Sequence, residues 1–182
     1  MRQFTTKFDR PTPYYVGMSK TVYRLELVVT EEGAPFYPAI GTKEHPSIDN
    51  AGYDLKIVVN QPPTTTAVLV GLGVKPRMVR KTIYEAGLVL EEDSHFSLEP
   101  RSSIFKSGFM MANSRGIIDR SYRGELKAPV ISVGSLNKSM EAGTRLFQVV
   151  APDMGYIEEV CFVESLPETS RGAGGFGSTG LK

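Results

Sequence analysis

The sequence predicts an all-β fold, a sandwich or barrel, and three observations carry this prediction. Apolar and polar residues alternate with a period of two in short runs that are rich in β-branched and aromatic side chains. Clusters of Pro, Gly, Asn and Ser separate these runs. No long window has the periodicity of an amphipathic helix. Short strands joined by frequent turns are typical of β-sandwiches and barrels.

The segments with the strand pattern are residues 21–29, 53–59, 66–74, 81–90, 95–99, 124–133, 144–151 and 156–164. The segment 102–109 (SSIFKSGF) is the best candidate for a short helix, with Ser102 as its N-cap. Pro129 lies inside a predicted strand and cannot donate a backbone hydrogen bond. We therefore expect that strand at a sheet edge or at a bulge.

Length and composition indicate one globular domain in a reducing compartment. A chain of 182 residues, 41% of them hydrophobic, can bury a core, and a formal net charge of +1 gives no ground for expecting a nucleic-acid or membrane partner. Cys161 is the only cysteine, so an internal disulfide is excluded, and its strand context favours a buried apolar role. The longest apolar stretch, 67–74, is too short to cross a bilayer. We expect a soluble, cytoplasmic protein, with a nuclear or viral setting left open.

The sequence contains little that indicates a metal centre or a catalytic nucleophile. The two histidines, His45 and His95, are fifty residues apart and the chain has one cysteine, so no zinc ligand set of the usual kind can be assembled. The segment 41–44 (GTKE) lacks the glycine spacing of a P-loop. A Ser–His–Asp arrangement stays open, although nothing around either histidine favours it.

The glycine-rich segment 171–180 (RGAGGFGSTG) has two interpretations. Fixing the backbone of each residue costs roughly 1–2 kcal/mol, so a disordered tail is the simpler one. The other is a lid that a ligand with phosphates and an aromatic ring would hold down. Arg171 could clamp an anion, Phe176 could stack on a flat group, and Ser178 and Thr179 could donate hydroxyl hydrogen bonds.

Four further polar stretches have both a structural and a functional interpretation. Asp54 is either a solvent-facing carboxylate or a site residue, and Arg101 beside Ser102 is either next to an ordinary N-cap or part of an anion site. The segment 113–125 has the pattern of a β-hairpin with an acid and an aromatic residue near its tip. Gln148 lies in an apolar strand, where a buried amide needs partners.

Taken together and in this order, these stretches resemble the five motifs of the trimeric dUTPase family, which hydrolyses dUTP to dUMP and pyrophosphate. The motifs are AGYDL (51–55), PRSS (100–103), NSRGIIDRSYRGE (113–125), GTRLFQ (143–148) and RGAGGFGSTG (171–180). The similarity extends over most of the chain from Ala51 to Gly180.

The resemblance implies a jelly-roll β-sandwich that assembles as a homotrimer with shared active sites. Residues 1–170 would form the β domain, with an N-terminal arm, and residues 171–182 a glycine-rich lid that closes over a site on a neighbouring subunit. The activity would limit uracil incorporation into DNA and supply dUMP for thymidylate synthesis.

The resemblance also implies the catalytic roles. Asp119 would hold the 3′-hydroxyl of the sugar and act as general base toward water attacking the α-phosphorus. Gln148 would contact the phosphates, and Asp54 would hold Mg²⁺ through its waters while the ion binds the three phosphates. Phosphate contacts would also come from Arg101, Ser102 and Ser103, the last at a position where many relatives have glycine.

The remaining implied contacts concern the nucleoside and the lid. Asn113 and the backbone near Gly116 and Ile118 would read the uracil, and Tyr122 would lie under the deoxyribose and exclude a 2′-hydroxyl. In the lid, Arg171 would pair with the γ-phosphate and Phe176 would stack on the base. The phosphate cradle would be completed by Gly177, Ser178 and Thr179.

Three alternatives remain at this point. In a dCTP deaminase of the same fold the catalytic glutamate would fall near Pro129, which cannot act as an acid or base. A nucleotide-responsive binding protein would engage a partner through residues 1–50 or 77–97, both long for the family. A structural jelly-roll protein would leave the polar motifs unexplained.

Overall fold

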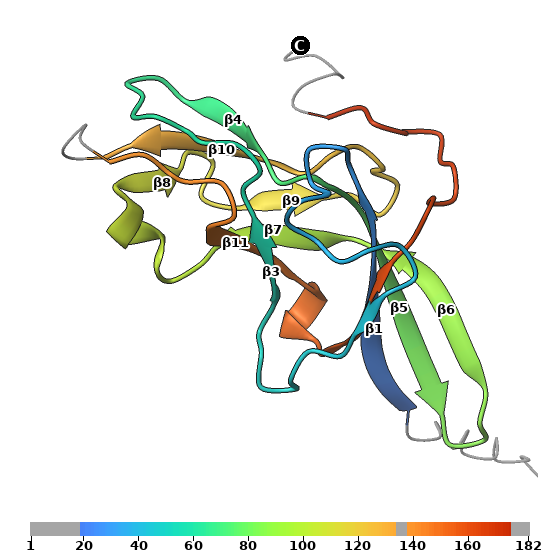
Figure 1. Ribbon diagram of the computed structural model, residues 1–182. Coiled ribbons are helices and arrows are strands. Elements are labelled where there is room, and N and C mark those ends of the chain that lie inside the picture. Colours follow the sequence, from blue (N-terminus) through green and yellow to red (C-terminus); the bar gives the residue numbers. More distant parts are fainter. Residues whose placement is uncertain (1–18, 134–137, 176–182) are drawn as a thin grey trace, which may run out of the picture.

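The computed structural model describes residues 19–133 and 138–175, and within these ranges it consists of strands, loops and two short 3₁₀ helices (Figure 1). Neither helix is long and apolar enough to cross a membrane. The elements are β1 (Ser19–Val29), β2 (Lys43–Glu44), β3 (Tyr53–Lys56), β4 (Val68–Gly71), β5 (Val74–Tyr84), β6 (Val89–Ser94), β7 (Phe96–Pro100), η1 (Ile104–Ser107), β8 (Phe109–Met111), β9 (Gly116–Ile118), β10 (Lys127–Ser132), β11 (Arg145–Val150), η2 (Pro152–Met154) and β12 (Ile157–Phe162). The predicted all-β class is confirmed.

The strands form three sheets. A five-stranded sheet has the order β2-β12-β1-β5-β6, a four-stranded sheet the order β3-β11-β7-β9, and a three-stranded sheet the order β4-β10-β8. The pairing of β1 with β5 is antiparallel along the whole of both strands, whereas β1 and β12 run parallel. In Figure 1 the β1, β5 and β6 strands extend together beyond the rest of the domain.

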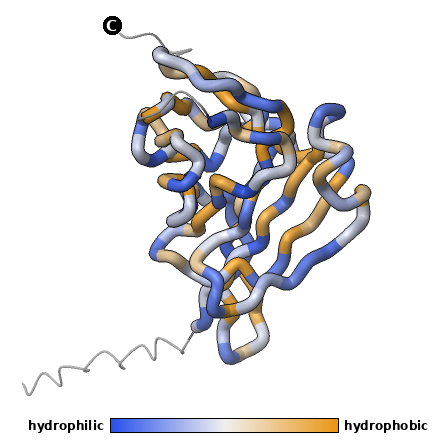
Figure 2. The backbone as a smooth tube through the Cα atoms, turned by 60° about the vertical axis from the view of Figure 1, so that its left-hand side comes forward, coloured by the Kyte–Doolittle hydropathy of each residue, from blue (hydrophilic) through white to orange (hydrophobic). Residues whose placement is uncertain are grey.

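The core lies where these sheets face one another. Alternation along β1 buries Leu25 and Leu27 completely, and Figure 2 shows hydrophobic residues interspersed with hydrophilic ones along the backbone. Phe109, Phe147 and Phe162 are also fully buried. Each such side chain contributes roughly 1.5–3 kcal/mol by leaving water, so the core stabilises the frame that holds the loops.

The prediction of one strand over 81–90 is wrong, because a hairpin turn interrupts it. Tyr84 and Leu88 close the turn with a backbone hydrogen bond of 2.9 Å from Tyr84 N to Leu88 O, and Gly87 takes φ +80°. The residues before the turn belong to β5 and those after it to β6. Alternation continues across the turn, so the pattern alone does not reveal the reversal.

The predicted strand 66–74 is also divided. Gly73 has φ +66°, and an added Cβ there would lie 2.7 Å from Gly33 Cα. The chain therefore turns at a glycine that another glycine contacts closely, ending β4 and leading into β5.

Two further expectations are wrong. The strand that contains Pro129 is β10, which lies between β4 and β8 rather than at an edge. The missing donor is tolerated because Pro129 lies where β8 has ended, and its carbonyl accepts from Ala112 N at 2.8 Å. The segment 113–125 is not a hairpin, since its only strand, β9, pairs with β7 and a turned loop follows.

Candidate active site

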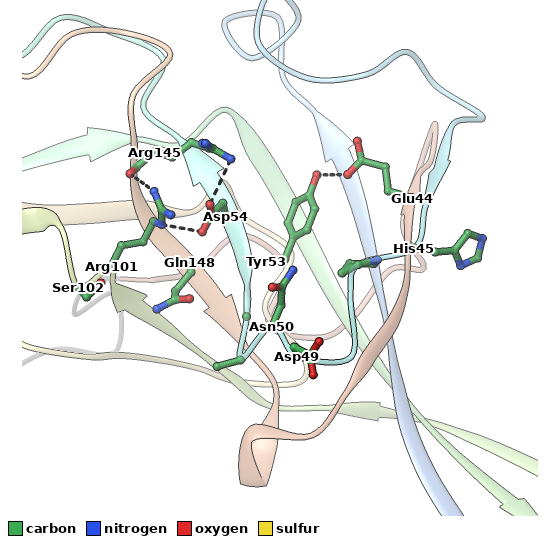
Figure 3. Close-up of a pocket in the computed structure, with 13 residues that line it drawn as sticks. Glu44, His45, Asp49, Asn50, Tyr53, Asp54, Arg101, Ser102, Arg145 and Gln148 are labelled. Atoms are coloured by element: carbon green, nitrogen blue, oxygen red, sulfur yellow. Dashed lines mark hydrogen bonds and ion pairs between the residues drawn. The ribbon is translucent and has the colours of Figure 1, made fainter.

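Three of the sequence motifs meet in one cavity of about 470 Å³ beside the β3–β11 edge of the four-stranded sheet (Figure 3). The AGYDL motif contributes from β3, the PRSS motif from the end of β7, and the GTRLFQ motif from β11. The lining is Glu44, His45, Pro46, Asp49, Asn50, Ala51, Gly52, Tyr53, Asp54, Arg101, Ser102, Arg145 and Gln148. We call this the first cavity.

Two arginines bind the carboxylate of Asp54. Arg101 Nε lies 2.8 Å from Asp54 Oδ1, and Arg145 Nη1 lies 3.5 Å from Asp54 Oδ2. Arg101 Nη1 also donates to the carbonyl of Arg145 at 3.0 Å (Figure 3). Among the described residues, each of the two guanidinium groups keeps donors without a partner, and both face a cavity where a phosphate chain could take charge-assisted hydrogen bonds.

Strand pairing places Gln148 beside Asp54. The two residues are partners in the β11–β3 ladder. Gly52 makes this close packing feasible, since an added Cβ there would lie 2.6 Å from Val149 O and 3.0 Å from Gln148 Oε1. The glycine of the AGYDL motif is thus required by packing against β11.

The PRSS loop differs from its prediction in one detail. Ser103, not Ser102, occupies the N-cap position of η1, and within the described part of the chain its side chain makes no capping hydrogen bond. Ser102 is exposed and lines the first cavity, whereas Ser103 is not among the lining residues. The Ser102 hydroxyl is therefore the better placed of the two for a ligand in this cavity.

The far wall of the first cavity holds Tyr53 and Glu44. The Tyr53 hydroxyl donates to Glu44 Oε2 at 2.7 Å. Burial and this carboxylate raise the pKa of Tyr53, so the phenol stays protonated and remains a donor. His45 points away from this cluster (Figure 3).

A second cavity, of about 180 Å³, collects the residues predicted to contact the nucleoside. It is lined by Leu98, Asn113, Gly116, Ile117, Ile118, Tyr122, Leu126, Lys127, Arg171 and Gly175. It lies on the β7–β9 side of the four-stranded sheet, and none of the described residues lines both cavities.

Tyr122 forms the floor of the second cavity. It is 9% exposed, its hydroxyl donates to Glu125 O at 2.7 Å, and burial raises its pKa. A Cβ on Gly124 would lie 2.5 Å from the Tyr122 hydroxyl, so this ring position requires a glycine two residues later. The ring is therefore fixed rather than free to rotate away.

Asp119 lies after β9, with its side chain 54% exposed, and pairs with Arg171 Nη1. The first residues of the predicted lid, 171–175, lie against the loop 119–125 of the same chain, with Arg123 N donating to Gly172 O at 2.8 Å. The family resemblance implied that the lid closes over a neighbouring subunit, which stays a prediction. Phe176, Gly177, Ser178 and Thr179 lie outside the described residues.

Arg145 belongs to the GTRLFQ motif but is not among the site residues predicted from the sequence. Its guanidinium is 57% exposed in the first cavity beside Asp54. Residues three apart on a regular strand face opposite sides of the sheet, so alternation gave no signal, and the β11–β3 ladder shifts register between Arg145 and Phe147.

The comparisons with known proteins agree with this arrangement of motifs. A model of the family described as dUTPase matches residues 44–180. The chain belongs to the dUTPase family. The match includes all five motifs, from AGYDL to the glycine-rich end.

Two relatives illustrate the similarity to named dUTPases. A deoxyuridine 5′-triphosphate nucleotidohydrolase of Wolinella succinogenes is 47% identical over 94 residues, which are 51% of this chain and 62% of that protein. One of Rickettsia rickettsii is 34% identical over 141 residues, covering 76% of this chain and 87% of that protein.

Two solved dUTPase structures match the chain at low similarity. The dUTPase of Staphylococcus bacteriophage 80alpha, a mutant with dUpNHpp, has a TM-score of 0.44 at 16% identity and covers 86% of this chain and 98% of that chain. The EIAV dUTPase has a TM-score of 0.43 at 16% identity, with 82% and 95% covered.

Proposed function

We propose that this member of the dUTPase family hydrolyses dUTP to dUMP and pyrophosphate in a homotrimer whose active sites combine residues of different subunits. The observation that carries the proposal is the convergence of Asp54, Arg101, Ser102 and Gln148 in one cavity of a chain in this family. We infer that the reaction takes place in a reducing compartment such as the cytoplasm, where Cys161 remains a thiol.

The first cavity would hold the triphosphate. Arg101 and Arg145 offer planar, permanently charged donors to phosphate oxygens. Ser102 adds a hydroxyl from the exposed loop before η1, and Gln148 adds an amide from β11. Such a site works by positioning and charge neutralisation, which dominate phosphoryl-transfer catalysis.

Mg²⁺ fits this cavity only as an ion that arrives with the substrate. Within residues 19–133 and 138–175 no group of three or more His, Cys, Asp or Glu side chains could hold a metal. Asp54 offers a single carboxylate, already paired with two arginines, which suits contact through water rather than direct ligation. When bound, Mg²⁺ would neutralise charge on the phosphate oxygens.

The second cavity would hold the uracil and the deoxyribose. Asn113 and the backbone of β9 would pair with the base, so cytosine, with its reversed hydrogen-bonding pattern, would leave groups unpaired. The fixed ring of Tyr122 would exclude a 2′-hydroxyl. Asp119, at the rim, would take a proton from the attacking water as its oxygen bonds to the α-phosphorus. The bond from this phosphorus to the bridging oxygen would break, and pyrophosphate would leave.

The separation of the two cavities supports an oligomer with shared sites, and the number of three subunits comes from the resemblance to the trimeric family. The cavities lie toward opposite edges of the four-stranded sheet, and in residues 19–133 and 138–175 they share no lining residue. One dUTP needs both sets of residues, so the first cavity of one subunit would face the second cavity of its neighbour, as closed cyclic symmetry allows.

Pyrophosphate release in the presence of Mg²⁺ tests the activity, with dUTP, dCTP, UTP and dTTP as substrates. We expect turnover of dUTP alone, and at least a hundredfold loss for Asp119→Asn, within the range of about 10²–10⁴ typical of a general base. Glu92→Gln, an exposed carboxylate of the β6 strand, is the matched control and should keep full activity. Ammonia released from dCTP would indicate a deaminase, and dUTP binding without cleavage would favour a nucleotide-responsive partner protein.

A further inference from the structure

Arg123 connects three segments that are distant in the sequence. Its guanidinium Nη1 donates to the carbonyls of Arg120 at 2.7 Å and Tyr122 at 2.9 Å. Its Nε donates to Pro167 O at 3.1 Å, and its Nη2 donates to Asp93 Oδ2 at 2.6 Å. The side chain is 8% exposed.

The carbonyl partners belong to the two segments that the proposed chemistry depends on. Arg120 and Tyr122 lie in the loop that begins at Asp119 and presents the ring of the second cavity. Pro167 lies in the chain that leads into the predicted lid, and the backbone N–H of Arg123 itself donates to Gly172 O at 2.8 Å. Arg123 thus binds both the loop 119–125 and the segment 165–172, which leads into the predicted lid and which we call the root of the lid.

The third partner ties this junction to the five-stranded sheet. Asp93 of β6 also accepts from Arg77 Nε of β5 at 2.8 Å, and Arg77 Nη1 donates to Glu26 of β1 at 3.0 Å. Cross-strand pairs of this kind fix the relative position of neighbouring strands. Arg123 is therefore held by a row of ion pairs that extends across the β1, β5 and β6 strands of the five-stranded sheet.

We propose that Arg123 is a positioning residue, which holds the Asp119–Tyr122 loop and the root of the lid in one shared arrangement braced by Asp93. The expected effect of Arg123 on dUTP turnover rests on the proposed function, whereas its expected effect on the order of the two segments does not. Arg123 is not among the lining residues of either cavity, and it acts through the backbone that carries Asp119, Tyr122 and Arg171.

A guanidinium is required for this role because three of its nitrogens reach separate partners. A lysine ammonium is a point charge on a flexible stem, which could keep the pair with Asp93 but could not reach the carbonyls on both sides. Arg123→Lys therefore separates the charge of the residue from its geometry.

Amide hydrogen exchange without nucleotide is the first test. We expect faster exchange in 119–125 and 165–175 for Arg123→Met and Arg123→Lys than for the wild type, with the core strands unchanged. Arg24→Met is the matched control, because it removes a guanidinium from the far end of the same row of ion pairs, where Arg24 binds Glu26 and Glu91. It should leave both segments protected.

Steady-state kinetics with dUTP is the second test. We expect kcat/KM to fall at least tenfold for both Arg123 variants, with kcat lowered as well as KM raised, since Asp119 loses its position. Asp93→Asn keeps the carbonyl contacts and should show a smaller effect of the same kind. Because exchange is measured without substrate, an inactive wild type would disprove the proposed function and leave this inference standing. Arg123 variants with wild-type exchange and kinetics, or full rescue by lysine, would overturn it.

Discussion

Arg171 pairs with the carboxylate of Asp119 in the same chain, so the cation expected at the γ-phosphate is bound to the expected general base. Arg171 Nε also donates to Gly174 O at 3.0 Å, which fixes the guanidinium over the second cavity. The ion pair occupies one carboxylate oxygen of Asp119 and holds Arg171 away from any phosphate. In our account the triphosphate competes for Arg171, and the carboxylate is released when the correct substrate is present.

Replacing Arg171 should affect dUTP and dUMP differently. Losing a charge-assisted hydrogen bond costs roughly 1.5–3 kcal/mol, so Arg171→Gln should raise the KM for dUTP by about ten- to a hundredfold. Product inhibition by dUMP should change little, because dUMP lacks the γ-phosphate. Inhibition constants measured alongside KM check this, and an equal loss for both nucleotides would place Arg171 at the nucleoside instead.

The glycine of the AGYDL motif should not tolerate a side chain. Gly52→Ala would press a Cβ against Val149 O and the Gln148 amide, and overpacking of this kind costs typically 1–3 kcal/mol. Thermal unfolding should show a lowered Tm together with reduced turnover. Ser102→Ala, which removes an exposed hydroxyl of the same cavity, should reduce turnover at unchanged Tm. If the Tm of Gly52→Ala equalled that of the wild type, β3 and β11 would have to pack less closely than in this structure.

Acid should weaken the ion pair between β1 and β6. Hydrogen bonds from Arg24 lower the pKa of Glu91 below its ordinary 4.5. A carboxyl with a lowered pKa stabilises the folded state above its ordinary pKa, and this contribution is lost as the pH falls through the lowered value. Glu91→Gln should therefore lower Tm at pH 7, and its difference from the wild type should vanish toward low pH. The more exposed Glu92→Gln should show a smaller difference, and a constant gap for Glu91→Gln would contradict the linkage.

The single thiol should be unreactive in the folded protein. Cys161 is 8% exposed, and burial together with the Glu159 carboxylate raises its pKa to about 11. Little thiolate is present at pH 8, so labelling by a thiol reagent should be more than tenfold slower in buffer than in denaturant. Mass spectrometry of time points measures both rates. Equal rates would show that β12 opens readily.

The strand content and the motifs were predictable because each rests on local pattern. Alternation located β1, β7, β11 and β12, and the polar residues Asp54 and Gln148 stood out within it. The strand predictions that were wrong concern features that depend on the pairing of strands distant in the sequence. Alternation continues through the turn at Gly87, and Pro129 is accepted in a central strand only because β8 ends beside it.

Other parts of the site could not be predicted, because the spacing of residues along the sequence does not give their distance in the folded chain. The motifs follow one another along the chain, yet the structure divides them between two cavities on different sides of a sheet. The pairing of Arg145 with Asp54 and of Arg171 with Asp119 likewise depends on strand register and loop path.

Subunit complementation tests the shared site most directly. Arg101→Ala disables the first cavity and Asp119→Asn the second, and each variant alone should be inactive toward dUTP. Co-assembled in equal amounts, they should recover roughly a quarter of the wild-type rate, because random mixing places an intact first cavity against an intact second cavity at that frequency. Recovery no greater than the sum of the separate variants would contradict the account and show that each chain completes its own site.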